Sequence, residues 1–103
     1  MTAQLHFSSG KCVGATAPEY PSAILTGFLA NVAKCYIGKT PEEISIHARK
    51  WAEAIRDMPA PSDMPFGWAL TQASVRADLE TYASEAEAAR KEILEHSTLE
   101  KVA

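Results

Sequence analysis

The side chains best suited to hold a metal are three histidines and two cysteines, and they are widely scattered. Zinc sites place such ligands in close pairs, as Cys-x-x-Cys or His-x-x-x-His, so that two ligands share one turn or one helix face. No two of these five have that spacing. We therefore predict no metal and no cofactor for the set His6, Cys12, Cys35, His47 and His96.

Catalytic signatures are also missing. Nucleophilic catalysis needs Ser, Cys or Thr beside a base, and no strand-turn-helix nucleophile motif is present. Ser8-Ser9-Gly10-Lys11 superficially resembles the end of a phosphate loop, but the glycine spacing is absent. A small helical domain without a pocket-forming sheet is a poor scaffold for an enzyme. We predict a protein that is not an enzyme, with Cys12 and Cys35 as reduced thiols.

Charge is divided unevenly along the 103 residues, whose formal net charge is −3. Residues 1–57 carry six Lys or Arg and five Asp or Glu, whereas residues 58–103 carry four and eight. One functional alternative is a DNA-binding or replication-accessory module with a basic helical hairpin. Its candidate residues are Lys34, Lys39, Arg49, Lys50 and Arg56.

The acidic second half favours a different partner, a protein with a basic surface. Acidic side chains on a helix complement such a surface, and aromatic residues near the start of that helix are typical contact residues. Nucleic acid is the less favoured partner because this half repels phosphate. The candidate partner-binding residues are Phe66, Trp68, Asp78, Glu80, Glu85 and Glu87.

The clearest local structure begins at Thr40-Pro41-Glu42-Glu43. Thr40 and Glu43 form a capping box, and Pro41 suits the first helical position. The helix over 41–57 has an apolar stripe with Trp51 at its middle, which we interpret as a core anchor, a binding hot spot being the alternative. His47 lies beside this stripe as a boundary histidine hydrogen-bonded to a neighbour. The stripe consists of Ile44, Ala48, Trp51, Ile55 and Met58.

An apolar helix is predicted before it, over 22–37, with Gly38 as a left-handed cap. The link from Gly38 to Thr40 is so short that the two helices should be neighbours in an antiparallel or strongly crossed hairpin. The face directed to the core comprises Leu25, Phe28, Leu29, Val32 and Tyr36.

A third helix is predicted over about 66–96, followed by a tail at 97–103. Its apolar residues alternate spacings of four and three, the rhythm of a helix that lies along a partner at a shallow angle. The partner is its own domain, or a second copy in a homodimer or homo-oligomeric structural subunit paired through 75–93. The stripe consists of Val75, Leu79, Tyr82, Ala86, Ala89 and Ile93.

Residues 1–19 have two equal interpretations, a short β-hairpin with a turn at Ser8-Ser9-Gly10-Lys11 or a flexible arm. The fold predicted for 1–103 is one all-α or mainly α domain, a compact bundle of three to four helices. No apolar run approaches the roughly 18 residues of a membrane helix, and no signal peptide is seen at the N-terminus. We expect a cytoplasmic protein that does not bind membranes.

Trp51, Ile55 and Pro59 stand in a W-x-x-x-I-x-x-x-P arrangement. Over residues 22–75 the pattern resembles the helical N-terminal domains of phage helicase loaders and helicase inhibitors, and it identifies no functional residue. Together these features predict a non-enzymatic protein-protein interaction module, a small regulator or inhibitor of the kind that phages encode. It would act by binding and masking the surface of a partner.

Overall fold

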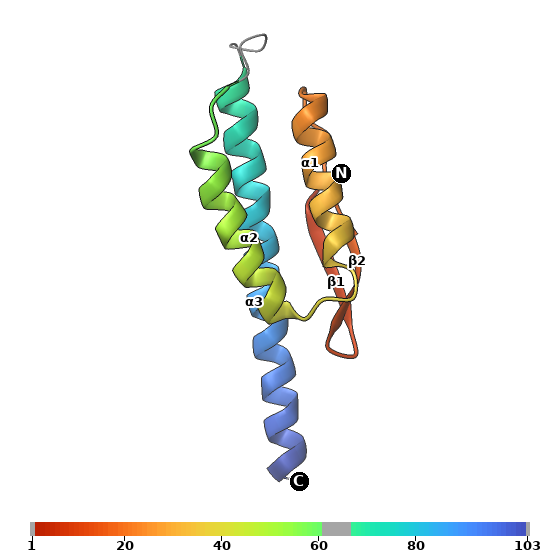
Figure 1. The fold of residues 1–103 in the computed structure, drawn as a ribbon. Coiled ribbons are helices and arrows are strands. Elements are labelled where there is room, and N and C mark those ends of the chain that lie inside the picture. Colours follow the sequence, from red (N-terminus) through yellow and green to blue (C-terminus); the bar gives the residue numbers. More distant parts are fainter. Residues whose placement is uncertain (1, 61–66, 103) are drawn as a thin grey trace.

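The computed structural model describes residues 2–60 and 67–102, which contain a two-stranded hairpin and three helices (Figure 1). The prediction of a mainly helical chain is confirmed. The molecule measures 60 × 21 × 17 Å along its principal axes. In chain order the elements are β1 (Gln4–Ser8), β2 (Lys11–Thr16), α1 (Ala23–Tyr36), α2 (Pro41–Arg56) and α3 (Trp68–Val102).

The N-terminal segment forms the antiparallel hairpin and not the flexible arm. Ser8 pairs with Lys11, so the loop has two residues, and both Ser9 and Gly10 have positive φ, of 55° and 79°. This is the backbone of a type I′ turn, which matches the twist of the flanking strands. Leu5 and Cys12 are buried against the helices, which stabilises a hairpin too small to be stable alone.

Both edges of the hairpin are covered by other parts of the chain. On the β2 edge, the Cys12 N–H donates to the Lys39 carbonyl at 2.9 Å, and the Gly38 N–H donates to the Cys12 carbonyl at 2.7 Å. On the β1 edge, the Leu5 N–H donates to Glu85 of α3 at 3.5 Å. The hairpin thereby fixes the link between α1 and α2.

Helix α1 begins after Ser22, whose hydroxyl accepts from the Leu25 N–H at 3.2 Å. It ends before Gly38, whose φ of 87° is the left-handed conformation predicted for the cap. Its buried residues are Leu25, Leu29, Val32, Ala33 and Tyr36, while Phe28 is half-buried.

Helix α2 begins at the predicted cap, where the Thr40 hydroxyl accepts from the Glu43 N–H at 3.3 Å. In the described chain the return bond from the Thr40 N–H to the Glu43 carboxylate does not form. Ile44, Ala48 and Ile55 are fully buried, as the stripe predicts. Trp51 is only half-buried and packs at the margin of the core, where its ring contacts Phe28 of α1.

Helix α3 packs along α2 and runs antiparallel to it (Figure 1). Val75, Leu79, Tyr82 and Ala86 are fully buried, whereas Ile93 is 37% exposed. The helix continues to Val102 and extends past the start of α2, beyond the boundary at 96 that we predicted. The extension contains Leu, Glu and Lys and no Gly or Pro, so nothing in its composition ends a helix.

The three helices do not form a simple bundle. Figure 1 shows α1 beside the hairpin, with its backbone separated from that of α2 although the two run antiparallel. Aromatic side chains bridge the gap, because the Phe28 and Trp51 rings lie edge to face with centroids 5.2 Å apart. None of the helices described here combines the length and apolar character needed to cross a bilayer.

Candidate functional site

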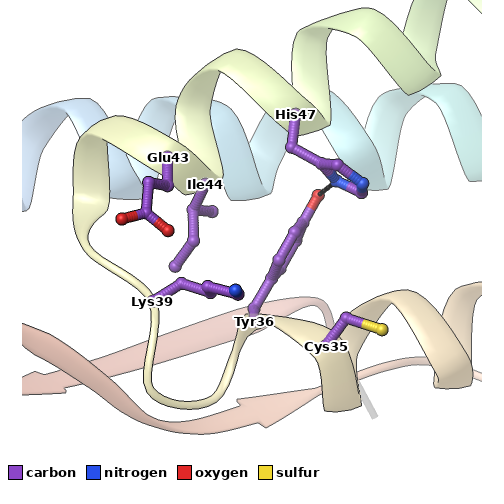
Figure 2. Close-up of a pocket in the computed structure, with 6 residues that line it drawn as sticks. All are labelled: Cys35, Tyr36, Lys39, Glu43, Ile44 and His47. Atoms are coloured by element: carbon purple, nitrogen blue, oxygen red, sulfur yellow. Dashed lines mark hydrogen bonds between the residues drawn. The ribbon is translucent and has the colours of Figure 1, made fainter.

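A pocket of about 210 Å³ opens where α1 ends and α2 begins (Figure 2). Its deep wall is apolar, since Tyr36 is 2% exposed and Ile44 is fully buried. Its rim carries polar and charged groups of several kinds. We call this hollow the junction pocket. It is lined by Cys35, Tyr36, Lys39, Glu43, Ile44 and His47.

Local structure accounts for the way these residues converge. Cys35 and Tyr36 lie in the last turn of α1, and Gly38 turns the chain so that Lys39 crosses between the helices. The hairpin fixes this crossing through the two bonds of Cys12. Glu43 and His47 are four residues apart on α2 and therefore share the helix face that borders the pocket.

Two side chains of the pocket lining, Tyr36 and His47, form a continuous hydrogen-bond chain with Trp51, which lies outside the lining. The Trp51 Nε1–H donates to His47 Nε2 at 2.8 Å, and His47 Nδ1 lies 2.9 Å from the Tyr36 hydroxyl. An indole N–H can only donate, so Nε2 must accept, and the proton of a neutral His47 lies on Nδ1. His47 Nδ1–H then donates to the Tyr36 oxygen. The prediction of a boundary histidine bonded to a neighbour is confirmed, with two neighbours.

Burial and neighbouring groups keep the His47 imidazole and the Tyr36 phenol uncharged. Burial lowers the pKa of His47, and the charges of Lys50 and Lys39 lower it further. Burial likewise raises the pKa of the Tyr36 phenol above its ordinary range, with smaller contributions from Tyr82 and Cys35. At neutral pH the pocket wall therefore consists of a neutral imidazole and a protonated phenol.

The same residues belong to a row of aromatic rings that are in contact with one another. The Tyr36 ring lies edge to face against His47 at 5.3 Å and against Tyr82 of α3 at 5.7 Å. Trp51 continues the row, 6.0 Å from His47 and in contact with Phe28. Such pairs contribute about 0.5–1.5 kcal/mol each beyond their buried area. The wall is thus tied to all three helices.

The rim carries charges that are not neutralised within the described chain. Lys39 and Glu43 are both exposed, and neither takes part in an ion pair in residues 2–60 and 67–95. Cys35 adds an exposed free thiol, whereas Cys12 is a buried free thiol. Within the described residues, no group of three His, Cys, Asp or Glu side chains is placed to hold a metal ion.

The predicted acidic contact residues mostly have partners within the chain. Asp78 accepts a hydrogen bond from the Tyr20 hydroxyl, and Glu85 accepts from the hairpin at Leu5. Glu80 is paired with Arg76 at 3.3 Å. Glu87 is exposed and binds Arg49 through two bonds of 2.8 Å. Asp78 and Glu85 are only partly accessible, because they face Tyr20 and the hairpin.

The two predicted aromatic contact residues have different outcomes. Trp68 is 5% exposed and belongs to the core, so its ring is not presented to solvent. Phe66 lies outside the described residues.

The predicted basic residues are not gathered into one patch. Lys34 and Lys50 are exposed on different helices, and Lys39 lies at the junction pocket. Arg49 is bound to Glu87, and Arg56 lies 3.4 Å from Asp57. The bond from Arg49 to Glu87 joins α2 to α3, so part of the basic set and part of the acidic set neutralise each other.

Sequence reasoning missed the junction pocket as a unit. It singled out His47, Lys39 and Cys35 separately, but it assigned Tyr36 only to the core. The available signal was the short link after Gly38, which forces the end of one helix against the start of the next. Comparison with protein-family models, with curated proteins and with solved structures found no match for the chain.

Proposed function

We propose that this chain is a non-enzymatic protein-protein interaction module, a regulator or inhibitor that masks a partner's surface by receiving one of its side chains in the junction pocket. The supporting observation is a small hollow bordered by the contacting rings of Tyr36 and His47, with unpaired charges at its rim. Interface hot spots are typically single anchoring side chains in such pockets.

The size of the pocket favours an anchor over a metabolite. Small-molecule sites usually enclose about 300–1,000 Å³, and this pocket has about 210 Å³. A hollow below that range accommodates one inserted side chain but encloses little of a cofactor or substrate.

Filling the pocket is the direct test. Cys35→Trp places a bulky ring at the rim from an exposed position, so the fold should tolerate it. Asn31→Trp is the matched control, since Asn31 is exposed on the same helix and does not line the pocket. Both variants and the wild type are immobilised and exposed to a lysate of the cells that naturally make the chain. Retained proteins are then quantified by mass spectrometry.

We expect at least one protein to be retained equally by the wild type and Asn31→Trp and to be lost with Cys35→Trp. Circular dichroism establishes that both variants are folded. Identical retained sets for all three proteins would contradict the proposal, because the pocket would then have no part in binding.

A second candidate function is a homo-oligomeric structural subunit. It is favoured by Ile93 and Leu94, which are 37% and 55% exposed where α3 passes the start of α2. In this alternative a second copy covers that part of the helix. Sedimentation equilibrium decides it: a dimer that Ile93→Glu dissociates supports the idea, and a monomer at high micromolar concentration contradicts it.

A further inference from the structure

The hydrogen-bond chain of the junction pocket leaves one proton unused. The Tyr36 oxygen accepts the His47 Nδ1–H, because Trp51 occupies the other imidazole nitrogen as a donor. The Tyr36 O–H is therefore not donated to His47. Among the described residues, no other group accepts that proton. The phenol is a donor whose acceptor is missing, at the wall of a hollow.

Lys39 supplies a second donor to the same hollow. Its ammonium is exposed and has no ion-pair partner within the described residues. Figure 2 shows the Lys39 side chain extending toward the base of the Tyr36 ring, whereas the Tyr36 hydroxyl lies at the far end of the ring, beside His47. Both residues line the same pocket, so they offer it a neutral O–H donor and a cationic N–H donor. A carboxylate, whose two oxygens both accept, can bind one donor with each oxygen.

We propose that the anchor received by the junction pocket is a carboxylate of the partner, bound through the Tyr36 hydroxyl and the Lys39 ammonium. This inference rests on the proposed function and specifies its chemistry. The apolar wall suits the methylene groups that precede such a carboxylate, since Ile44 and the Tyr36 ring offer no polar atoms there. A cationic anchor is disfavoured beside Lys39, because the ammonium of Lys39 repels it.

Glu43 makes the proposal sharply testable, because its carboxylate opposes the binding of another carboxylate. In Figure 2 it lies on the side of the pocket away from the Tyr36 hydroxyl. It is exposed, so solvent weakens the repulsion without removing it. Removal of this charge should therefore strengthen binding, an effect that a purely structural role of Glu43 does not produce.

The experiment is a titration of the ¹⁵N-labelled full chain followed by NMR. The probe is N-acetylglutamate α-amide, whose only carboxylate is on the side chain, and its neutral match is N-acetylglutamine α-amide. N-acetylglycine tests a chain-terminal carboxylate as the alternative source. We expect saturable shifts at Tyr36, Lys39 and His47 with at least one carboxylate probe and none with the amide. The stronger of the two carboxylate probes identifies the source.

Variants of the pocket residues test which side chains bind the carboxylate. Lys39→Gln should weaken binding of the carboxylate probe about tenfold, as expected for loss of a charge-assisted hydrogen bond. Lys34→Gln, an exposed charge outside the pocket, should leave it unchanged. Glu43→Gln should strengthen it about twofold, as expected for a solvent-screened like charge. Tyr36→Phe should resemble Lys39→Gln, and if it does not fold, the Lys39 and Glu43 variants decide the matter.

Equal responses to the carboxylate and amide probes would overturn the proposal, as would no response at 50 mM or weaker binding by Glu43→Gln. That failure is distinguishable from failure of the proposed function. Capture by the wild type with loss in Cys35→Trp would still support an interaction module, one whose pocket takes a neutral anchor.

Discussion

The interface between α2 and α3 and the junction between α1 and α2 differ in how closely their helices pack. Along α3, Val75, Leu79 and Ala86 are fully buried, and the two helices pack directly on each other. At the junction the backbones stand apart, and they are bridged by the ring contact of Phe28 with Trp51 and by the hydrogen bond between Tyr36 and His47. The first region is a closed core, whereas the second contains a hollow with an apolar deep wall and a polar rim.

Under the proposed function, the difference separates the residues that stabilise the domain from those that bind the partner. Close packing of apolar side chains stabilises most when no space is left. A recognition pocket needs the opposite, open space whose walls do not collapse. At the junction pocket, Tyr36 and His47 form part of the lining, and Trp51 and Phe28 continue the row of contacting rings outside it.

The largest predicted effect comes from a cavity in the closed core. Leu79→Ala should lower the free energy of unfolding by about 2–5 kcal/mol, because it removes a fully buried side chain that the surroundings cannot replace. Urea denaturation measures the change. Leu70→Ala is the control on the same helix, since Leu70 is 78% exposed and should change stability by less than about 0.5 kcal/mol. Equal losses would contradict the burial of the α3 stripe.

A smaller effect is predicted at the junction. Trp51→Phe keeps an aromatic ring but removes the N–H that binds His47, and should cost about 1 kcal/mol. A double-mutant cycle with His47→Leu isolates the shared bond and should give a coupling of about 0.5–1.5 kcal/mol. Additive losses in the cycle would show that the two side chains act independently.

Acid should lower the stability of the folded chain through His47. The pKa of His47 is lowered in the folded state, so the unfolded chain binds a proton more readily. The free energy of unfolding should therefore fall as the pH drops below about 6.5, the ordinary histidine value, and level off below the folded pKa. Urea midpoints between pH 7.5 and 5.5 measure this. His47→Gln should flatten the dependence, and an unchanged slope in that variant would assign it to other groups.

The smallest effect should come from the ion pair between Arg49 and Glu87. Both side chains are about half exposed, so solvent and salt screen their attraction. Arg49→Gln should leave the urea midpoint unchanged within error at physiological salt. A clear loss of stability would show that charge pairing, and not only apolar packing, holds α2 to α3.

Local signals in the sequence predicted much of the fold. The Thr40 cap, the Gly38 cap and the apolar stripes around Ile44 and Leu79 lie where the spacing places them, because each depends on residues a few positions apart. The separation of α1 from α2 was not predictable in this way, since it depends on the hairpin that fixes the link at Lys39.

The site was less predictable than the fold. A pocket forms where side chains from different elements do not fill the space between them. The spacing of residues along the sequence does not predict such unfilled space. The sequence pattern predicts Asp78 as a surface charge on a helix. In the structure it accepts a hydrogen bond from Tyr20, 58 positions earlier in the chain. The apolar stripe of the first helix predicts Tyr36 only as a core residue. Its free hydroxyl proton follows from the structure, because Trp51 and His47 determine which atom of the hydroxyl takes part in the hydrogen-bond chain.

The most direct test of the account is therefore the protonation state of His47, read from the ¹⁵N chemical shifts of its imidazole nitrogens at neutral pH. We predict a protonated, pyrrole-type Nδ1 and an unprotonated, pyridine-type Nε2, which together leave the Tyr36 proton free for a ligand. The opposite tautomer would contradict the account, because Tyr36 would then donate to His47 and the pocket would lose its neutral donor.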